Sequence, residues 1–237
     1  MNFVILVFMF IAEFFALKHY IKIMYPKIGW NTLLSKSLCS LIFVITAIAA
    51  QCFSDNGFAF NTMLAAFICS FFGDVFLHVY PKLGNVIVNY ALGGVSFLAG
   101  HVLYIVSFAK AEKAFVLPEN IFVVQLIAAA VLCIAVNILM RVFSLKLGKF
   151  SVPVIIYSFA LMIMVVKAVT LGYMLAVSGR GLIPAFATGI GAVLFAASDI
   201  VLASDFFTGG KDLKKKTANM ILYYSGQMLL ATSLLWI

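Results

Sequence analysis

The sequence predicts an all-α, polytopic membrane protein with eight transmembrane helices and no soluble domain. The 237 residues are 65% hydrophobic and only 10% charged, and the mean hydropathy is +1.17; a soluble domain carries about 25% charged residues. The apolar residues are gathered in blocks of about 20, the length at which a helix crosses the hydrocarbon core. The connections between blocks are too short for a further domain. Residues 1–237 are therefore expected to form one helical unit.

The eight expected spans follow one another along the whole chain, and each pair is separated by residues that turn the chain or anchor it at the membrane surface. The spans are residues 2–20, 33–51, 59–79, 87–109, 120–141, 152–176, 183–206 and 217–236. The breaks between them fall at Tyr25-Pro26-Lys27, Ser54-Asp55-Asn56-Gly57, Tyr80-Pro81-Lys82, Lys110 to Pro118, Lys146 to Lys149, Ser178 to Gly181, and Gly209 to Lys216.

The net charge of +8 is distributed unevenly between the two sides of this eight-helix arrangement. Eleven cations fall on one side: Lys18, Lys22, Lys27, Lys82, Arg141, Lys146, Lys149, Lys211, Lys214, Lys215 and Lys216. Three fall on the other, namely Lys110, Lys113 and Arg180. The positive-inside rule places the first side in the cytoplasm and both termini outside it. The basic side can also attract anionic lipid. An insertion signal therefore accounts for the charge, and no nucleic-acid partner is predicted.

Two acidic residues inside apolar spans give the strongest functional signal. Asp74 stands in Gly73-Asp74-Val75-Phe76-Leu77, and Asp199, 125 residues later, stands in Ser198-Asp199-Ile200-Val201-Leu202. An ionised side chain at membrane depth costs roughly 2.5–3.5 kcal/mol, so it rarely lacks a partner or a function. The two sites lie four spans apart at similar depth. This suggests a duplication, with helices 1–4 repeated in 5–8 about an axis along the membrane normal. Such an axis would bring the two carboxylates face to face.

Other polar residues are expected at the same level, and this predicts one polar pocket that opens toward the cytoplasmic leaflet. They are Lys36, Tyr157, Tyr223, Tyr224 and Gln227, with His101 and Tyr104 nearer mid-membrane and Glu13 approaching that level. Structural roles are the alternative for each. The aspartates can form ion pairs with Lys36 or Lys167, His101 can link helices by a hydrogen bond, and Lys36 can reach the interface.

Several other classes of site are not supported by the sequence. The four cysteines show no CxxC and no paired spacing, which favours free thiols in apolar surroundings. There is no HExxH, no Walker loop and no nucleophile elbow. These absences argue against a zinc protease, a nucleotide-driven pump and a serine lipase. His78 follows Asp74 by four residues, but its place at the interface favours solvent exposure over metal ligation.

A series of motifs gives the chain a resemblance to a known family. In order, they are Ser35-Lys36-Ser37-Leu38, Phe72-Gly73-Asp74-Val75, Gly100-His101-Val102-Leu103-Tyr104, Val152-Pro153 through Tyr157, Gly191-Ala192-Val193-Leu194-Phe195, Ser198-Asp199, Asp205-Phe206 and Tyr223-Tyr224-Ser225-Gly226-Gln227. In this order and spacing the chain resembles the YhhN-like lysoplasmalogenase family of membrane hydrolases. Ser37 and Gly226 stand where the family often has Pro and Ala. Helix 1, with Glu13, lies outside the resemblance.

The resemblance implies hydrolysis of the vinyl ether bond of a lysoplasmalogen, which releases a fatty aldehyde and a glycerophospho-base. It implies no metal and no organic cofactor. This reaction needs a proton donor, a negative group beside the oxocarbenium ion, and a held water. Two carboxyl groups in a medium of low dielectric do not ionise together easily. Asp74 and Asp199 are therefore predicted to be the catalytic pair, one as acid and one as anion.

The other polar residues of these motifs are predicted to bind substrate or position water: Lys36, His101, Tyr104, Tyr157, Ser198, Tyr224 and Gln227. Lys36 would hold the phosphate as a point charge. The expected partners are a lysophospholipid substrate and membrane lipid, in a bacterial inner membrane. A small proton-coupled transporter or lipid-binding protein that uses the same aspartates is the alternative, because proton relays also use acids in the membrane. A hydrolase or isomerase for another lipid is a third interpretation.

Overall fold

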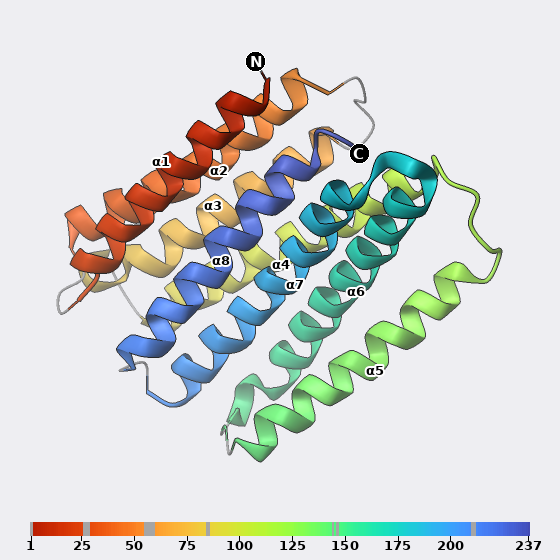
Figure 1. Cartoon of the computed structure of the whole chain (residues 1–237). Coiled ribbons are helices and arrows are strands. Elements are labelled where there is room, and N and C mark those ends of the chain that lie inside the picture. Colours follow the sequence, from red (N-terminus) through yellow and green to blue (C-terminus); the bar gives the residue numbers. More distant parts are fainter. Residues whose placement is uncertain are drawn as a thin grey trace.

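A computed structural model describes residues 2–25, 29–54, 60–83, 86–143, 145, 147–209 and 212–237. Parts of the expected breaks, including Lys27, 55–57, Lys146 and Lys211, lie outside the described residues. Within the described residues eight α-helices lie side by side in one bundle, and both chain termini lie at the same end (Figure 1). They are α1 Asn2–Ile23, α2 Trp30–Cys52, α3 Phe60–Leu83, α4 Val86–Glu112, α5 Ile121–Val142, α6 Ser151–Leu175, α7 Leu182–Phe207 and α8 Leu213–Ser233.

Seven of these helices, α1 to α7, are long and apolar enough to cross a membrane. The prediction of an all-α polytopic membrane protein is therefore confirmed, although the composition of α8 differs from that of the other seven. The first turn of α8 carries Lys214, Lys215 and Lys216, and its inner face carries buried polar groups such as Gln227. The helix packs against α7, α2 and α1. Protein surrounds much of α8, and such a helix does not need an apolar surface all round.

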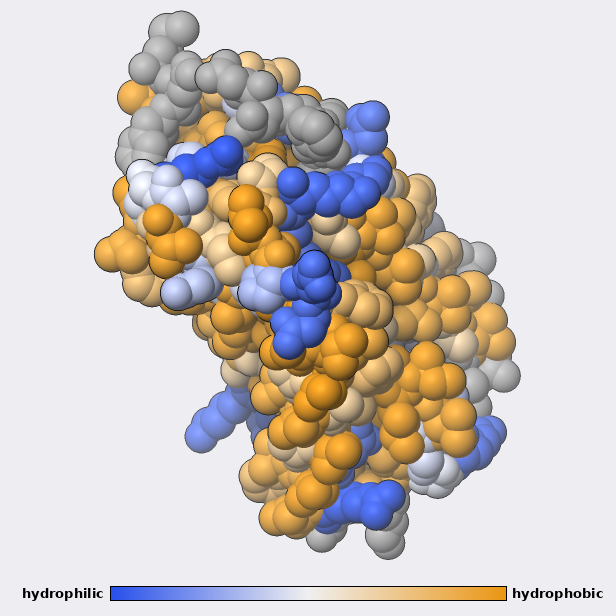
Figure 2. All heavy atoms as spheres, turned by 90° about the vertical axis from the view of Figure 1, so that its right-hand side faces the viewer, coloured by the Kyte–Doolittle hydropathy of each residue, from blue (hydrophilic) through white to orange (hydrophobic). Residues whose placement is uncertain are grey.

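Large apolar side chains cover the outside of the bundle. On α5, for example, Phe122, Ile127 and Ile134 are each at least half exposed. Figure 2 shows one face of the molecule, on which hydrophobic side chains form a broad surface and hydrophilic ones are few. A soluble protein rarely exposes so much contiguous apolar surface. The chain is therefore an integral membrane protein.

The helix contacts follow the order expected of a duplication. In the first half α1 packs on α2, α2 on α3, and α3 on α4; in the second α5 packs on α6, α6 on α7, and α7 on α8. The halves meet in corresponding ways, since α2 contacts α8 and α6 contacts α4. The α3–α4 and α7–α8 pairs each approach closely at a glycine. A Cβ on Gly100 would lie 3.3 Å from the Ala66 carbonyl oxygen, and a Cβ on Gly226 would lie 2.8 Å from that of Gly191.

The helix ends lie within a few residues of the expected breaks, except at one break; α8, for example, begins at Leu213, inside the expected break Gly209 to Lys216. The carboxylate of Asp212 caps α8 by accepting from the backbone N–H groups of Lys214 and Lys215. Gly179 and Gly181 turn the chain between α6 and α7 with φ of +83° and +97°. The exception is Tyr80-Pro81-Lys82, where α3 continues to Leu83. Proline removes only its own N–H from the ladder, and the last turn of a helix has few bonds to lose.

The α7–α8 contact gives a test of the packing. The Gly226→Ala variant is expected to destabilise the protein by about 1–3 kcal/mol, because the new Cβ meets backbone atoms of α7 that cannot rotate away. Gly94→Ala is the matched control, since nothing lies within 4 Å of a Cβ at Gly94. Thermal unfolding of the purified protein in detergent measures both. Equal melting temperatures for the two variants would contradict the close approach of α7 and α8.

Candidate functional site

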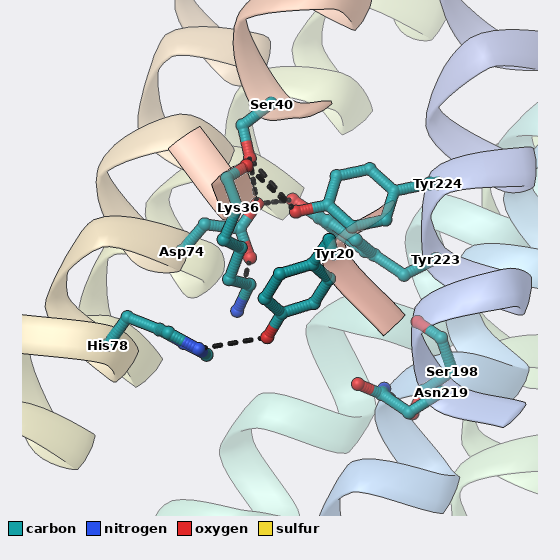
Figure 3. A network of polar contacts seen from close by, with 9 residues as sticks. All are labelled: Tyr20, Lys36, Ser40, Asp74, His78, Ser198, Asn219, Tyr223 and Tyr224. Atoms are coloured by element: carbon teal, nitrogen blue, oxygen red, sulfur yellow. Dashed lines mark hydrogen bonds and ion pairs between the residues drawn. The ribbon is translucent and has the colours of Figure 1, made fainter. Parts of the chain in front are cut away.

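Asp74, on α3, lies in a buried network that joins three helices. Its Oδ1 is 2.9 Å from the Lys36 Nζ on α2. Its Oδ2 accepts hydrogen bonds from the Ser40 hydroxyl at 2.6 Å and from the Tyr223 hydroxyl, on α8, at 2.8 Å. Figure 3 shows these polar groups turned toward one another. The Asp74 carboxylate thus has three donors, one of them an ammonium group. This arrangement fits the ionised form of the carboxyl group.

The sequence around Asp74 explains how the network forms. Ser40 follows Lys36 by one helical turn, so both side chains face α3 from the same side of α2. Gly73 leaves room for the ring of Phe97, since a Cβ there would lie 2.7–2.9 Å from ring atoms. The Tyr224 hydroxyl lies 3.2 Å from both the Ser40 hydroxyl and the Lys36 carbonyl oxygen. Ser40 was not among the predicted site residues, although its position one turn after Lys36 was a usable signal. Tyr223 was expected at the level of the pocket but was given no role in the site.

Asp199, on α7, has a separate network. Its Oδ2 accepts a hydrogen bond from the Tyr157 hydroxyl, on α6, at 2.7 Å, and lies 3.2 Å from the His101 Nε2, on α4. The Tyr157 hydroxyl is also 3.0 Å from that nitrogen, so the three groups form a triangle. The Nδ1 of His101 is buried and has no hydrogen-bond partner in the described part of the chain. A neutral imidazole that carries its proton on Nε2 and donates it to Asp199 fits these contacts.

The two networks are linked by aromatic rings. The Tyr223 ring, whose hydroxyl bonds to Asp74, packs edge-on against Phe195 with a centroid separation of 5.4 Å. Phe195 in turn packs against the His101 ring at 5.0 Å. Phe97 contacts both Tyr223 and Phe195. We call Phe97, Phe195 and Tyr223 the aromatic layer. In the described part of the chain no hydrogen bond or ion pair joins Asp74 to Asp199, and their shared role remains a prediction.

Both networks lie in the same half of the bundle. Asp74 is nine residues before the end of α3, and Asp199 is eight before the end of α7. At 1.5 Å per residue these positions are about 12–14 Å inside the end opposite the two termini. The described cations of that end include Lys18, Lys22, Arg141 and Lys149. We call it the lysine-rich end.

Three further predicted residues lie near these networks but bond elsewhere. The Tyr104 hydroxyl donates to the Gln227 Oε1 at 2.8 Å. The Nε2 of Gln227 is buried and has no hydrogen-bond partner within the described ranges. The Ser198 hydroxyl donates to the Phe195 carbonyl of its own helix, and its backbone carbonyl accepts from Asn219. The contacts of Ser198 thus hold α7 against α8, and Asn219, which sequence reasoning missed, supplies the link.

A third buried network corrects the expectation that the polar groups gather in one half of the membrane. Lys167, on α6, donates to the Glu112 Oε2 at 2.6 Å and to the Gln125 Oε1 at 2.8 Å. Gln125, on α5, donates to the Glu112 Oε1 at 2.7 Å. Glu112 is the last residue of α4, at the end of the bundle where the termini lie. All three side chains are satisfied and buried, which fits a link that fastens α5 to the bundle.

The lysine-rich end also carries an open groove between α1 and α2, with a volume of about 660 Å³. It is lined by His19, Ile23, Gly29, Trp30, Asn31, Thr32, Leu34 and Ser35. Ser35 precedes Lys36, but none of the predicted site residues lines this groove. The two aspartates are surrounded by close hydrogen bonds, and the pocket predicted around them stays a prediction.

Metal ligands and reactive thiols are not grouped in the part of the chain that the structure describes. No three His, Cys, Asp or Glu side chains there converge on one point. His78 is not simply solvated, because its Nε2 lies 2.9 Å from the Tyr20 hydroxyl. The four cysteines are free thiols; Cys39 and Cys133 are buried, whereas Cys52 is exposed.

The fold and these networks define the class of the protein: a polytopic membrane protein with ionised groups held between its helices. A comparison with protein families adds the relationship. The model of the YhhN family matches residues 31–234, and the chain belongs to that family. The YhhN family includes lysoplasmalogenases. No curated protein and no solved structure matched the chain.

The Lys36–Asp74 pair predicts a specific pattern of stabilities. Lys36→Met leaves a buried carboxylate without its counter-ion, and breaking such a pair costs about 3–5 kcal/mol. Adding Asp74→Asn to Lys36→Met removes the unpaired charge, so the double variant is expected to recover part of the stability that Lys36→Met loses. Thermal unfolding of the two single variants and the double variant measures the coupling. Additive losses would show that the two groups do not interact.

Proposed function

We propose that this protein hydrolyses the vinyl ether bond of lysoplasmalogens, with Asp74 and Asp199 as its catalytic carboxylates. The substrate CH=CH–O group and one water become a fatty aldehyde and a free glycerol hydroxyl. The observation that carries the proposal is the pair of buried carboxylates, each held by phenol hydroxyls at the same depth of the bundle. Family membership supports the same reaction.

The contacts of Asp74 suit the anion that this reaction requires. Protonation of the vinyl ether carbon gives an oxocarbenium ion, and glycosidases stabilise a related ion with a carboxylate. Lys36, Ser40 and Tyr223 hold the Asp74 carboxylate in place before the cation forms. Such preorganised electrostatics is usually the largest catalytic term. The predicted contact of Lys36 with the substrate phosphate remains part of the proposal, beside its ion pair with Asp74.

Asp199 is suited to activating the water. The carboxylate, the Tyr157 hydroxyl and the His101 imidazole lie within 3.2 Å of one another. A carboxylate in such a triangle can accept a proton from water that attacks the oxocarbenium carbon. The hemiacetal formed then collapses to aldehyde and alcohol. The substrate chain would lie among the apolar side chains of the bundle, and the pocket would face the cytoplasmic leaflet at the lysine-rich end.

The proposal predicts that Asp74→Asn and Asp199→Asn each lose about 10²–10⁴-fold in aldehyde release from a lysoplasmenyl lipid. Asp205→Asn is the matched control, because Asp205 is a buried carboxylate of α7 to which no catalytic role is assigned and whose Oδ1 accepts from the Asp212 backbone N–H. Aldehyde is measured with purified protein in detergent micelles, after thermal unfolding has shown that each variant folds.

Three outcomes separate the alternatives. Loss in both variants with activity kept in Asp205→Asn supports the proposal. Activity at the wild-type level in both variants contradicts the catalytic role of the aspartates. If the wild-type protein releases no aldehyde in micelles but moves protons or lipid across sealed vesicles, it is a carrier and the proposed hydrolysis is wrong.

A further inference from the structure

Glu13 of α1 is a buried carboxyl group to which no role has yet been assigned. Its side chain is only 4% exposed. Both of its carboxyl oxygens are buried and have no hydrogen-bond partner among the residues that the structure describes. Asp74, Asp199 and Glu112 each have at least two polar partners. Glu13 is therefore in a different chemical state from these three.

Glu13 lies beside the Asp74 network. The Asp74 carboxylate is close enough to Glu13 for the two acidic groups to interact through their charges. The Cys39 thiol, on α2, is close enough to Glu13, Asp74 and Lys36 to interact with the charge of each. Tyr20, two helical turns after Glu13 on α1, bonds to His78, one turn after Asp74 on α3. In Figure 3 the Tyr20 ring lies to one side of the Lys36–Asp74 pair, and its hydroxyl points to His78. One face of α1 thus closes this side of the network.

The surroundings of Glu13 favour a neutral acid. An ionised carboxylate that is removed from water and has no donor is very unfavourable, and the nearby Asp74 carboxylate adds like-charge repulsion. Asp74 and Asp199, in contrast, accept hydrogen bonds in the manner of carboxylate anions. The proposed hydrolysis still needs a group that gives a proton to carbon, and the two aspartates do not fill that role well.

We propose that Glu13 is the proton donor of the vinyl ether hydrolysis, acting opposite the Asp74 anion. This inference rests on the function proposed above. The family match covers residues 31–234, so α1 would add a catalytic group from outside the matched segment.

The steps balance as follows. The Glu13 carboxyl proton goes to the β-carbon of the vinyl ether; the π electrons form the new C–H bond and leave an oxocarbenium ion beside Asp74. Water adds to the oxocarbenium carbon and gives one proton to the Asp199 carboxylate. The hemiacetal hydroxyl then returns its proton to Glu13 as the carbon–oxygen bond to glycerol breaks. The proton held by Asp199 passes to the departing glycerol oxygen, directly or through water, which restores both carboxyl groups.

The test compares Glu13→Gln and Glu13→Asp with the wild-type protein in the micelle assay. Glu13→Gln keeps the shape of the side chain but has no acidic proton, and it is expected to lose about 10²–10⁴-fold in aldehyde release. Glu13→Asp keeps the acid and is expected to restore part of that activity. Glu112→Gln, an equally buried carboxyl group in the opposite half, is the control and is expected to keep its turnover per folded molecule.

Infrared spectroscopy gives a readout that does not depend on turnover. A protonated carboxyl group has a C=O stretching band that an ionised one lacks. The band is expected in the wild-type protein and in Glu112→Gln at neutral pH, and it should disappear in Glu13→Gln. This measurement on the wild-type protein alone decides the protonation state even where a variant does not fold.

The outcomes distinguish the two proposals. If the wild-type and Glu13→Gln proteins release aldehyde equally while Asp74→Asn does not, the hydrolysis stands and Glu13 is not its acid. The absence of a protonated carboxyl band in the wild-type protein also overturns the role of Glu13. If the wild-type protein releases no aldehyde at all, the proposed function fails first, and the role of Glu13 in it fails with it.

Discussion

A charge inside an apolar helix bundle must have partners, and this requirement determines how the helices of this protein are fastened together. Each of the three networks joins three helices: α2, α3 and α8 at Asp74; α4, α6 and α7 at Asp199; and α4, α5 and α6 at Glu112. Lipid offers no hydrogen bonds, so the carboxylates of these three networks find their donors on neighbouring helices. The polar groups thereby fix which helices are neighbours.

The two aspartate networks share a plan but differ in chemistry. In each, an aspartate near the C-terminal end of a helix takes partners from the preceding helix and from one in the other half of the bundle. The glycine crossings of α3–α4 and α7–α8 follow the same plan. Asp74 has an ammonium group as its partner, whereas Asp199 has an imidazole. The same plan has thus placed an ammonium group beside one aspartate and an imidazole beside the other.

The aromatic layer has consequences for any chemistry at these sites. Phe97, Phe195 and Tyr223 link the networks through ring contacts, so the carboxylates need not share one proton. In the proposed mechanism this separation would let Asp74 remain an anion among its donors while the Asp199 carboxylate accepts a proton from water. The donation of a proton to carbon would then fall to another group, and the buried carboxyl group of Glu13 is the one proposed for it.

The sequence by itself determined the class of fold, the helix boundaries to within a few residues, and the residues Asp74, Asp199, Lys36, His101 and Tyr157 that form the networks. Apolar block length and the cost of buried charge act locally, and they can be read along the chain. Which residues meet was decided only by the tertiary structure. Lys36 pairs with Asp74, Lys167 reaches Glu112, and Ser40 and Tyr223 join through contacts between helices distant in sequence. The tertiary structure also explains the polar composition of α8, because neighbouring helices take the place of lipid around it.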